Sequence, residues 1–384
     1  MFSERSGIDL RPNAISELVT RLRGSGTALL DLTLSNPTQA DLDLPGLPSL
    51  DRAGAARYEP VAAGLLSARQ AVAAWMAEHA LPVSEDRIVL TASTSEAYAY
   101  LFKLLCDPGD EVLAPRPSYP LLAHLARFEA VALREYPIAF DGHFHLDLAA
   151  LRSAPTNRSR AVIAVHPNNP TGSYLTREEL RALGELGLPV ISDEVFAPYP
   201  LDPSQDACVS ALEQQSGLVA TLHGLSKLGS PQLKVSWLCV GGDDALVSRA
   251  LERLEMIADT FLSVATPVQL ALPDLLRSND AGIAAIRART RENLQRLRAA
   301  CAGSAVSVLH AGGGWNAVLR LPSTASDEAW ALSLLEGAHV LVQPGYFYDF
   351  EGPPCCVVSL LPRPDALEAG ARKLVAHVEH ALQR

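Results

Sequence analysis

Short hydrophobic runs alternate with amphipathic segments along the central part of the chain. From Ile88 onward, each apolar run is followed by a polar loop, and most of these loops lead into a segment with helical periodicity. The apolar runs lie at residues 88–90, 111–114, 161–165, 189–192, 218–222 and 235–240. Strands that alternate with helices indicate a mostly parallel sheet with covered faces. The pattern therefore predicts the α/β class.

The pattern changes after about residue 243. Long helices are predicted at 245–258 and about 283–300, followed by a mixture of strands (307–309, 317–321, 356–361) and helices (328–336, 365–382). We interpret residues 305–384 as a smaller α+β domain that the N-terminal segment joins, with a helix at 14–23 and a short strand at 29–34. The expected division is an N-terminal arm with part of the small domain (1–50), a large domain (51–265), and an interdomain helix with the small C-terminal domain (266–384).

Composition and charge narrow the possible partners. The chain has 384 residues, of which 48% are hydrophobic, and a formal net charge of −11, which argues against a nucleic acid or an anionic membrane as partner. No apolar run has the length needed to cross a bilayer, and the polar first eleven residues do not resemble a signal peptide. The six cysteines lack CxxC or zinc-type spacing. We therefore expect a cytoplasmic protein with reduced thiols and no metal.

Polar loops follow the predicted strands, and ligands collect at the carboxyl ends of strands in an open parallel sheet. The loop Thr91–Ser95 brings hydroxyls and backbone N–H groups to the start of a helix, which suits a phosphate; an ordinary helix cap supported by Glu96 is the alternative. Tyr119 could stack on a planar ring. The turn 168–172 presents asparagine amides to an oxygen, unless it is a plain turn.

Two further loops carry charged groups beside apolar runs. Asp193 follows a buried strand and needs a cationic partner, such as a pyridinium nitrogen or a structural arginine. The chain has only four lysines, and two of them, Lys227 and Lys234, fall in the loop 223–234. An amine in a partly dry site loses its proton readily and attacks a carbonyl to form a Schiff base. A solvated surface loop is the alternative.

Together these loops describe one ligand. A helix start can hold a phosphate, an aromatic side chain can stack on a ring, an amide can bond the ring oxygen, an acid can pair with the ring nitrogen, and a lysine can hold an aldehyde. That combination predicts pyridoxal 5'-phosphate as the cofactor.

The chain resembles the class I/II aminotransferases, pyridoxal-phosphate enzymes of fold type I, over nearly its whole length. The resemblance implies a large domain with a mostly parallel central sheet flanked by helices, which binds the cofactor, and a smaller α+β domain. The matching stretches are Leu34–Pro37, Tyr58–Pro60 with Gly64-Leu65, Thr91–Ala97, Pro117–Pro120, Asn168–Gly172, Asp193–Phe196 and Leu225–Lys227.

The resemblance also implies a role for each matching residue. Lys227 would form the Schiff base and carry a proton during catalysis, and Asp193 would hold the ring nitrogen. Asn169 would bond the ring hydroxyl, and Tyr119 would stack on the ring. The phosphate would be bound by Ser93, Thr94, Ser95, Ser226 and Lys234. Tyr58 would reach the phosphate of a neighbouring subunit, which implies a homodimer. The substrate would contact Asn36, Asn169 and Arg363.

Four positions depart from the family pattern. Phe196 replaces a tyrosine, which removes one hydrogen bond to the ring oxygen, and Tyr199 is a possible substitute. Lys234 replaces the phosphate-binding arginine, so that a point charge takes the place of a fork. Gly224, beside His223, replaces a serine. Val357 stands where an arginine normally binds the substrate carboxylate, which leaves Arg363 and Arg320 as candidate cations.

The leading functional hypothesis is an aminotransferase of amino-acid metabolism, which moves an amino group between an amino acid and a 2-oxo acid. A lyase or decarboxylase on the same scaffold is the alternative, because a missing carboxylate arginine would suit altered control over which bond at the amine-bearing carbon breaks. A non-catalytic cofactor-binding or regulatory protein is a third hypothesis. It is disfavoured because Lys227, Asp193 and Asn169 are all present.

Overall fold

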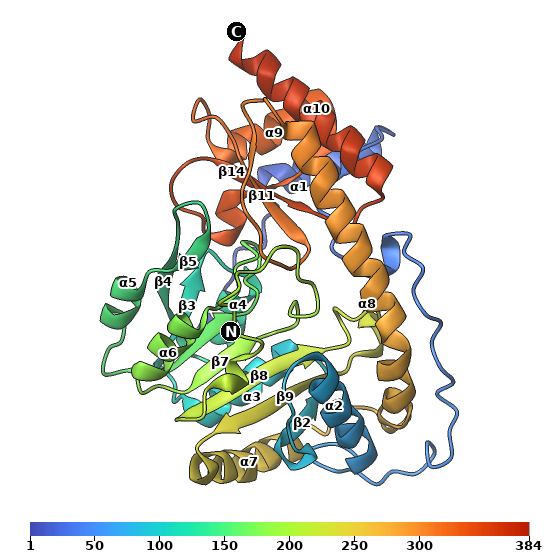
Figure 1. The fold of residues 1–384 in the computed structure, drawn as a ribbon, viewed down its shortest axis with the longest axis vertical. Helices are drawn as coiled ribbons and strands as arrows, with labels where there is room; N and C mark the ends of the chain where they lie inside the picture. The colour runs from blue at the N-terminus through green and yellow to red at the C-terminus, as the bar shows by residue number, and fades with distance from the viewer. Residues whose placement is uncertain (384) are drawn as a thin grey trace.

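The computed structural model describes residues 1–383, so only Arg384, at the end of the predicted 266–384 unit, lies outside the described residues. Its largest sheet has eight strands in the order β2-β9-β8-β7-β6-β3-β4-β5 and occupies the lower half of Figure 1. The strands are β2 (Ile88–Thr91), β3 (Glu111–Arg116), β4 (Ala132–Phe140), β5 (Phe144–Leu146), β6 (Ser159–Val165), β7 (Val190–Asp193), β8 (Leu218–Gly224) and β9 (Ser236–Gly242).

The centre of this sheet is parallel and its edges are antiparallel. The pairs β8–β7, β7–β6, β6–β3 and β3–β4 run parallel, whereas β9 pairs antiparallel with β8 and β2, and β5 pairs antiparallel with β4. The carboxyl ends of the central strands therefore meet along one edge of the sheet. The predicted α/β class with a mostly parallel, helix-flanked sheet is confirmed.

Helices cover the large sheet on both faces, because its central strands are hydrophobic on both sides. Every residue of β7 is buried, and β6 is buried except at Arg160. The covering helices are α2 (Leu66–His79), α3 (Thr94–Leu105), α4 (Leu121–Phe128), α5 (Leu148–Ser153), α6 (Arg177–Glu185) and α7 (Asp244–Asp259).

A second sheet lies in the upper half of Figure 1 and has the order β10-β11-β14-β13. All its pairs are antiparallel. Two short strands, β1 and β12, form a separate parallel pair, through which the N-terminal segment joins this half of the molecule. The elements here are α1 (Ala14–Gly24), β1 (Leu30–Asp31), β10 (Ser307–Val308), β11 (Asn316–Arg320), α9 (Asp327–Ala338), β12 (Val340–Leu341), β13 (Gln343–Pro344), β14 (Cys355–Ser359) and α10 (Pro364–Leu382).

One long helix, α8 (Thr266–Cys301), connects the two halves and runs up the right side of Figure 1. Near its start, Leu272 and Leu275 pack in the hydrophobic cluster that includes α2. Near its end, Leu294 and Leu297 pack in the cluster that includes α9 and α10. This helix therefore belongs to both hydrophobic cores and fixes how the two sheets face each other.

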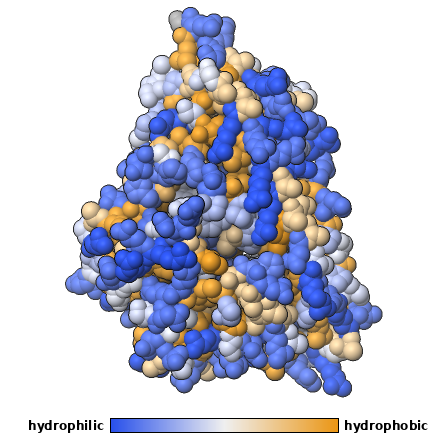
Figure 2. Space-filling view, in the orientation of Figure 1, coloured by the Kyte–Doolittle hydropathy of each residue, from blue (hydrophilic) through white to orange (hydrophobic). Residues whose placement is uncertain are grey.

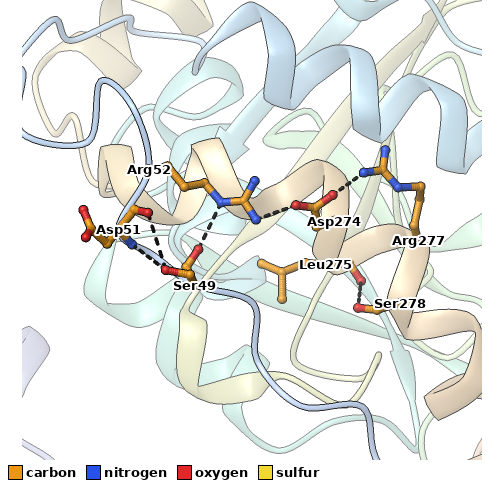
Figure 3. A network of polar contacts seen from close by, with 7 residues as sticks. All are labelled: Ser49, Asp51, Arg52, Asp274, Leu275, Arg277 and Ser278. Carbon is orange, nitrogen blue, oxygen red and sulfur yellow. Dashed lines mark hydrogen bonds and ion pairs between the residues drawn. The ribbon is translucent and has the colours of Figure 1, made fainter.

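The connector between η2 (Pro37–Gln39) and α2 runs along the outside of the molecule and is tied to α8 by a polar network (Figure 3). Arg52 forms an ion pair with Asp274, and its Nε donates to the carbonyl oxygen of Ser49 at 3.0 Å. Arg277 binds the same carboxylate from the next turn of α8. These contacts fasten the connector six residues before Tyr58. The face of the molecule drawn in Figure 2 is mainly polar, with smaller hydrophobic patches between the charged side chains.

Three local predictions differ from the structure. The strands β4 and β5 were not expected, because the exposure of β4 near the sheet edge alternates only weakly. The helix predicted at about 283–300 begins earlier, at Thr266, and continues past Pro273. The strand expected at 29–34 is reduced to Leu30–Asp31. The predicted domain boundaries at residues 50 and 265 stay a prediction.

Candidate active site

A cavity of about 220 Å³ lies at the carboxyl ends of β6, β7 and β8. It brings together most of the predicted cofactor-binding residues, although they are spread over more than a hundred positions of the chain. The predicted residues in its wall are Ser93, Thr94, Ser95, Tyr119, Asn169, Asp193, Ser226, Lys227 and Lys234. The parallel sheet causes this convergence, because each loop leaves the sheet at the same edge.

The first turn of α3 forms one side of the cavity. Ser93 is the N-cap of this helix, and its Oγ accepts a hydrogen bond from the backbone N–H of Glu96 at 3.1 Å. The Glu96 side chain in turn accepts from the N–H of Ala92 at 2.7 Å. Ser93 therefore acts as an ordinary helix cap and also lines the cavity. The first N–H groups of a helix lack partners within the helix, so those of Thr94 and Ser95 are suited to an anion.

Lys227 lines the cavity, and two aromatic rings that pack against each other lie beside its amine. Its Nζ lies 5.1 Å from the centre of the Phe196 ring and 5.0 Å from that of Trp315. Burial lowers the pKa of this amine below its ordinary value, while the nearby Asp193 carboxylate opposes the shift. A buried amine with a lowered pKa is uncharged, and hence nucleophilic, at a lower pH than an exposed lysine.

Asp193 ends β7 and is 7% exposed. Burial raises the pKa of its carboxyl to about 6, against hydrogen bonds from the Val195 N–H at 3.3 Å and the Tyr98 hydroxyl at 3.2 Å. Its hydrogen-bond partners are thus neutral groups. A cationic group in the cavity would remove the cost of holding this carboxylate in its charged form. Tyr98 was not among the residues predicted from the sequence, because it lies on the buried face of α3 among apolar side chains.

Asn169 lies in the turn after β6, and the structure brings a residue from the other sheet to it. The Nδ2 of Asn316, the first residue of β11, donates to the Oδ1 of Asn169 at 2.7 Å. The turn is held from within by Asn168, whose Oδ1 accepts from the Thr171 hydroxyl at 2.9 Å. The loop before β11 packs closely against this turn. A Cβ atom at Gly172 would lie 2.6 Å from the carbonyl oxygen of Gly313.

The structure shows the contacts of four positions that the sequence analysis discussed in connection with departures from the family pattern. Lys234 lines the cavity, and its backbone has a left-handed φ of 52°. Tyr199 is fully buried, and its hydroxyl donates to the carbonyl oxygen of Lys227. His223 is packed against Trp237, and burial lowers its pKa to about 3, so it is neutral. Gly224 has no room for a side chain, because its Cβ would lie 2.2 Å from the Ser236 Oγ.

The remaining predicted residues lie outside this cavity. Tyr58 is 79% exposed, and the Asn36 Oδ1 accepts from the N–H of Thr38 at 3.0 Å. Arg363 was expected to contact the substrate, but its side chain lies outside the cavity. Its guanidinium binds Asp365 at 3.1 Å and lies 3.8 Å from Asp41.

The structure is apolar at position 357, where the family resemblance predicts an arginine for the substrate carboxylate. Val357 is fully buried in a cluster with Val318, Leu309 and Tyr348. Arg320 lies in a neighbouring cavity, 5.1 Å from the centre of the Phe140 ring. The cations in the wall of the 220 Å³ cavity are lysines, so no arginine of the described residues lines it.

Two solved aminotransferases illustrate the structural similarity of this chain to known proteins. The alanine aminotransferase from Pyrococcus furiosus superposes with a TM-score of 0.84 over 99% of this chain and 100% of that chain, at 22% sequence identity. An aminotransferase from Escherichia coli gives a TM-score of 0.84 over 99% of this chain and 98% of that chain, at 23% identity. The fold is that of the fold type I aminotransferases.

The sequence family agrees with the fold. The family model described as aminotransferase class I and II matches residues 30–367, and the chain therefore belongs to this family, whose members are generally pyridoxal-phosphate-dependent. Glutamate-pyruvate aminotransferase AlaA of Escherichia coli is 27% identical over 280 residues, 70% of this chain and 68% of that protein. The S-alkyl-thiohydroximate lyase SUR1 of Arabidopsis thaliana is 28% identical over 229 residues, 57% of this chain and 49% of that protein. The chain thus spans about half to two thirds of these curated relatives. No helix among residues 1–383 is long and apolar enough to span a membrane.

Proposed function

We propose that this protein is a pyridoxal-phosphate-dependent aminotransferase that moves an amino group between an amino acid and a 2-oxo acid. The observation that carries the proposal is the cavity that Lys227 and Asp193 share. It combines a buried amine whose pKa is lowered with a buried carboxylate that has neutral hydrogen-bond partners. Membership of the class I and II family supports the same reaction.

The lining residues fit this cofactor. The start of α3 with Ser93, Thr94 and Ser95, together with Ser226 and Lys234, would hold the phosphate. Tyr119 would stack on the ring, Asn169 would bond its oxygen, and Asp193 would pair with its nitrogen. The pairing supplies Asp193 with the cationic partner that its burial calls for. When bound, the cofactor supplies an aldehyde that condenses with amines and a ring that withdraws electrons from the amine-bearing carbon.

Lys227 would perform the proton transfer. Because burial lowers its pKa, its Nζ is able to take a proton from the amine-bearing carbon of the donor. The packed rings of Phe196 and Trp315 lie on one side of this amine and limit the access of water there. Asp193 in its charged form would keep the ring nitrogen protonated, which maintains the ring as an electron acceptor.

We also propose a homodimer in the cytoplasm, with Tyr58 of each subunit at the phosphate of the other. Tyr58 is exposed and lies outside the cavity of its own chain, as a residue that serves a neighbouring subunit would. The net charge of −11 is consistent with small-molecule substrates, rather than nucleic acids, as the partners.

The substrate end supports a second candidate function, a lyase on the same scaffold. Among residues 1–383 no arginine lines the cavity, and Val357 is buried among apolar side chains, so none of these residues holds the donor carboxylate with a fork at this place. Asn36 and Asn169 would contact the substrate as hydrogen-bonding groups. Arg363 would serve only after breaking its pairing with Asp365. A relative named as a lyase adds weight to this candidate.

A half-reaction separates the two functions. The cofactor-loaded protein is mixed with one amino acid at a time, without a 2-oxo acid, and the cofactor's spectrum and the products are recorded. An aminotransferase gives stoichiometric conversion of the cofactor to its amine form and one equivalent of 2-oxo acid. Catalytic release of ammonia or of a side-chain fragment without an acceptor would assign the lyase function instead.

A further inference from the structure

A side-chain hydrogen bond joins the two sheets at the edge of the cavity. Asn316 begins β11 in the small sheet, and Asn169 lies in the turn after β6 in the large sheet. The Nδ2 of Asn316 donates to the Oδ1 of Asn169 at 2.7 Å. The two residues are 147 positions apart in the sequence, so the bond links distant parts of the chain.

The direction of this bond determines what Asn169 offers to the cavity. A side-chain amide has an acceptor on one end and two donors on the other. Because the oxygen of Asn169 already accepts from Asn316, the group left for a ligand is its NH₂. Asn169 therefore presents a donor to the cavity and favours an oxygen that accepts, best of all an anionic one.

The backbone keeps Asn316 in position to do this. The Gly313 N–H donates to the Gly172 carbonyl at 2.9 Å, and the Gly314 N–H donates to the Tyr199 carbonyl at 2.9 Å. The Leu360 N–H donates to the carbonyl of Trp315 at 2.7 Å. The segment just before Asn316 is thus bonded to the asparagine turn itself, so the two amides are held at a fixed separation.

Phe196 and Tyr199, the two aromatic residues considered for this bond, offer no substitute donor. Phe196 has no hydroxyl, and the hydroxyl of Tyr199 is engaged with the carbonyl oxygen of Lys227. With both excluded, we assign the bond to a ring oxygen to the NH₂ of Asn169, and the orientation of this amide decides whether the bond forms.

We propose that Asn316 is a positioning residue that holds the NH₂ of Asn169 toward the anionic ring oxygen of the bound cofactor. This rests on the proposed function, because it presumes that pyridoxal phosphate occupies the cavity. A donor at the ring oxygen stabilises its negative charge and so lowers the pH at which the neighbouring chromophore loses its proton. Asn316 thereby compensates for the hydroxyl that Phe196 lacks, without touching the cofactor.

The test is a pH titration of the bound cofactor's absorbance in Asn316→Asp. The ionised carboxylate of this variant only accepts hydrogen bonds, so Asn169 must rotate its NH₂ toward position 316 and its oxygen toward the ring. We expect the titration midpoint to rise by about one pH unit or more, since one unit corresponds to the differential energy of a typical hydrogen bond. In Asn316→Ala the amide is free to rotate, and we expect a smaller rise. The Kd of the cofactor, measured by fluorescence, serves as a second readout.

Asn157→Asp is the matched control, because it adds the same charge at an exposed position before β6, at the opposite end of that strand. Its midpoint should equal that of the unmodified protein. An unchanged midpoint in Asn316→Asp would mean that Asn169 donates to position 316, and would overturn the proposal. Equal shifts in Asn316→Asp and Asn316→Ala would also overturn it, since they would indicate a loss of packing. Failure of the unmodified protein to take up pyridoxal phosphate would instead refute the proposed function.

Discussion

The Nζ atom of Lys227 lies 5.0 Å from the centre of the Trp315 ring, so the reactive amine is enclosed by a residue of the small-sheet half of the chain. Two effects of this ring oppose each other. A ring face attracts the protonated amine by about 0.5–2 kcal/mol. Exclusion of water disfavours the same form and shifts a fully buried lysine by up to about 3–5 pKa units. Burial as a whole lowers the pKa of Lys227, so we expect the exclusion of water to be the larger of the two effects at this ring.

We therefore predict that Trp315→Ala raises the pKa of Lys227. The measurement is reductive methylation of the cofactor-free protein over a range of pH, followed by mass spectrometry of each lysine. In the unmodified protein Lys227 should react at a lower pH than Lys373, which is exposed on α10. In Trp315→Ala the two lysines should react at more similar pH. A fall in the pH at which Lys227 reacts would show that the ring acts mainly by attraction.

Replacing Asp193 should affect stability and cofactor binding in opposite directions. Its carboxyl has a native pKa of about 6, above the unfolded value of about 3.9. The native state therefore binds more protons than the unfolded state between these values, and stability is lost as the pH rises from about 4 to about 6. Asp193→Asn removes this loss, so above pH 6 the cofactor-free variant should be more stable by about 3 kcal/mol.

Urea unfolding of the cofactor-free proteins at pH 4 and pH 7.5 measures this difference, which should be near zero at the lower pH. The same variant should bind pyridoxal phosphate more weakly, because a neutral amide cannot pair with the ring nitrogen. A stability difference that is the same at both pH values would contradict the assigned pKa of Asp193.

Tyr98 should matter for the cofactor although it does not line the cavity. Its hydroxyl donates to the Asp193 carboxylate at 3.2 Å and lowers the pKa of that group. In Tyr98→Phe the carboxyl should protonate more readily and pair less well with the ring nitrogen. We expect about a tenfold weaker cofactor affinity at neutral pH, which corresponds to one hydrogen bond to a charged group. Equilibrium dialysis at pH 7 and pH 9 tests this, and the deficit should shrink at the higher pH.

Mixing two defective variants tests the shared site that Tyr58 implies. In Lys227→Ala and Tyr58→Ala each homodimer has two impaired sites. A hybrid dimer should regain one site that combines an intact Lys227 with Tyr58 of the partner subunit. Random exchange should restore about a quarter of all sites, because half of the dimers are hybrids and each has one complete site. If Tyr58 acts within its own chain, mixing the two proteins restores nothing.

The sequence was most informative where chemistry and local pattern coincide. Asp193 ends one buried strand and Lys227 lies in the loop after another, so their convergence follows from the rule for parallel sheets. Lys234 lies in the same loop, was assigned to the phosphate through the family resemblance, and lines the cavity. These positions depend on local order in the chain, which the sequence displays.

The sequence was silent where the site depends on tertiary packing. Trp315 and Asn316 come from the other half of the chain, and glycines that bond to the asparagine turn bring them to the cavity. Tyr98 lies on the buried face of α3, so its sequence pattern is that of an ordinary core residue. Arg363 and Arg320 were the candidates for the substrate carboxylate, but Arg363 pairs with Asp365 outside the cavity and Arg320 lies in a different cavity. No pattern within a short window reveals such contacts.

The central claim is that Lys227 carries the cofactor, and covalent trapping tests it most directly. The protein is loaded with pyridoxal phosphate, reduced with borohydride, digested and analysed by mass spectrometry. We predict that one equivalent of the reduced cofactor is attached to Lys227. With Lys227 intact, none should be attached to Lys103, Lys234 or Lys373. Attachment to Lys234, or an unlabelled Lys227, would contradict the account.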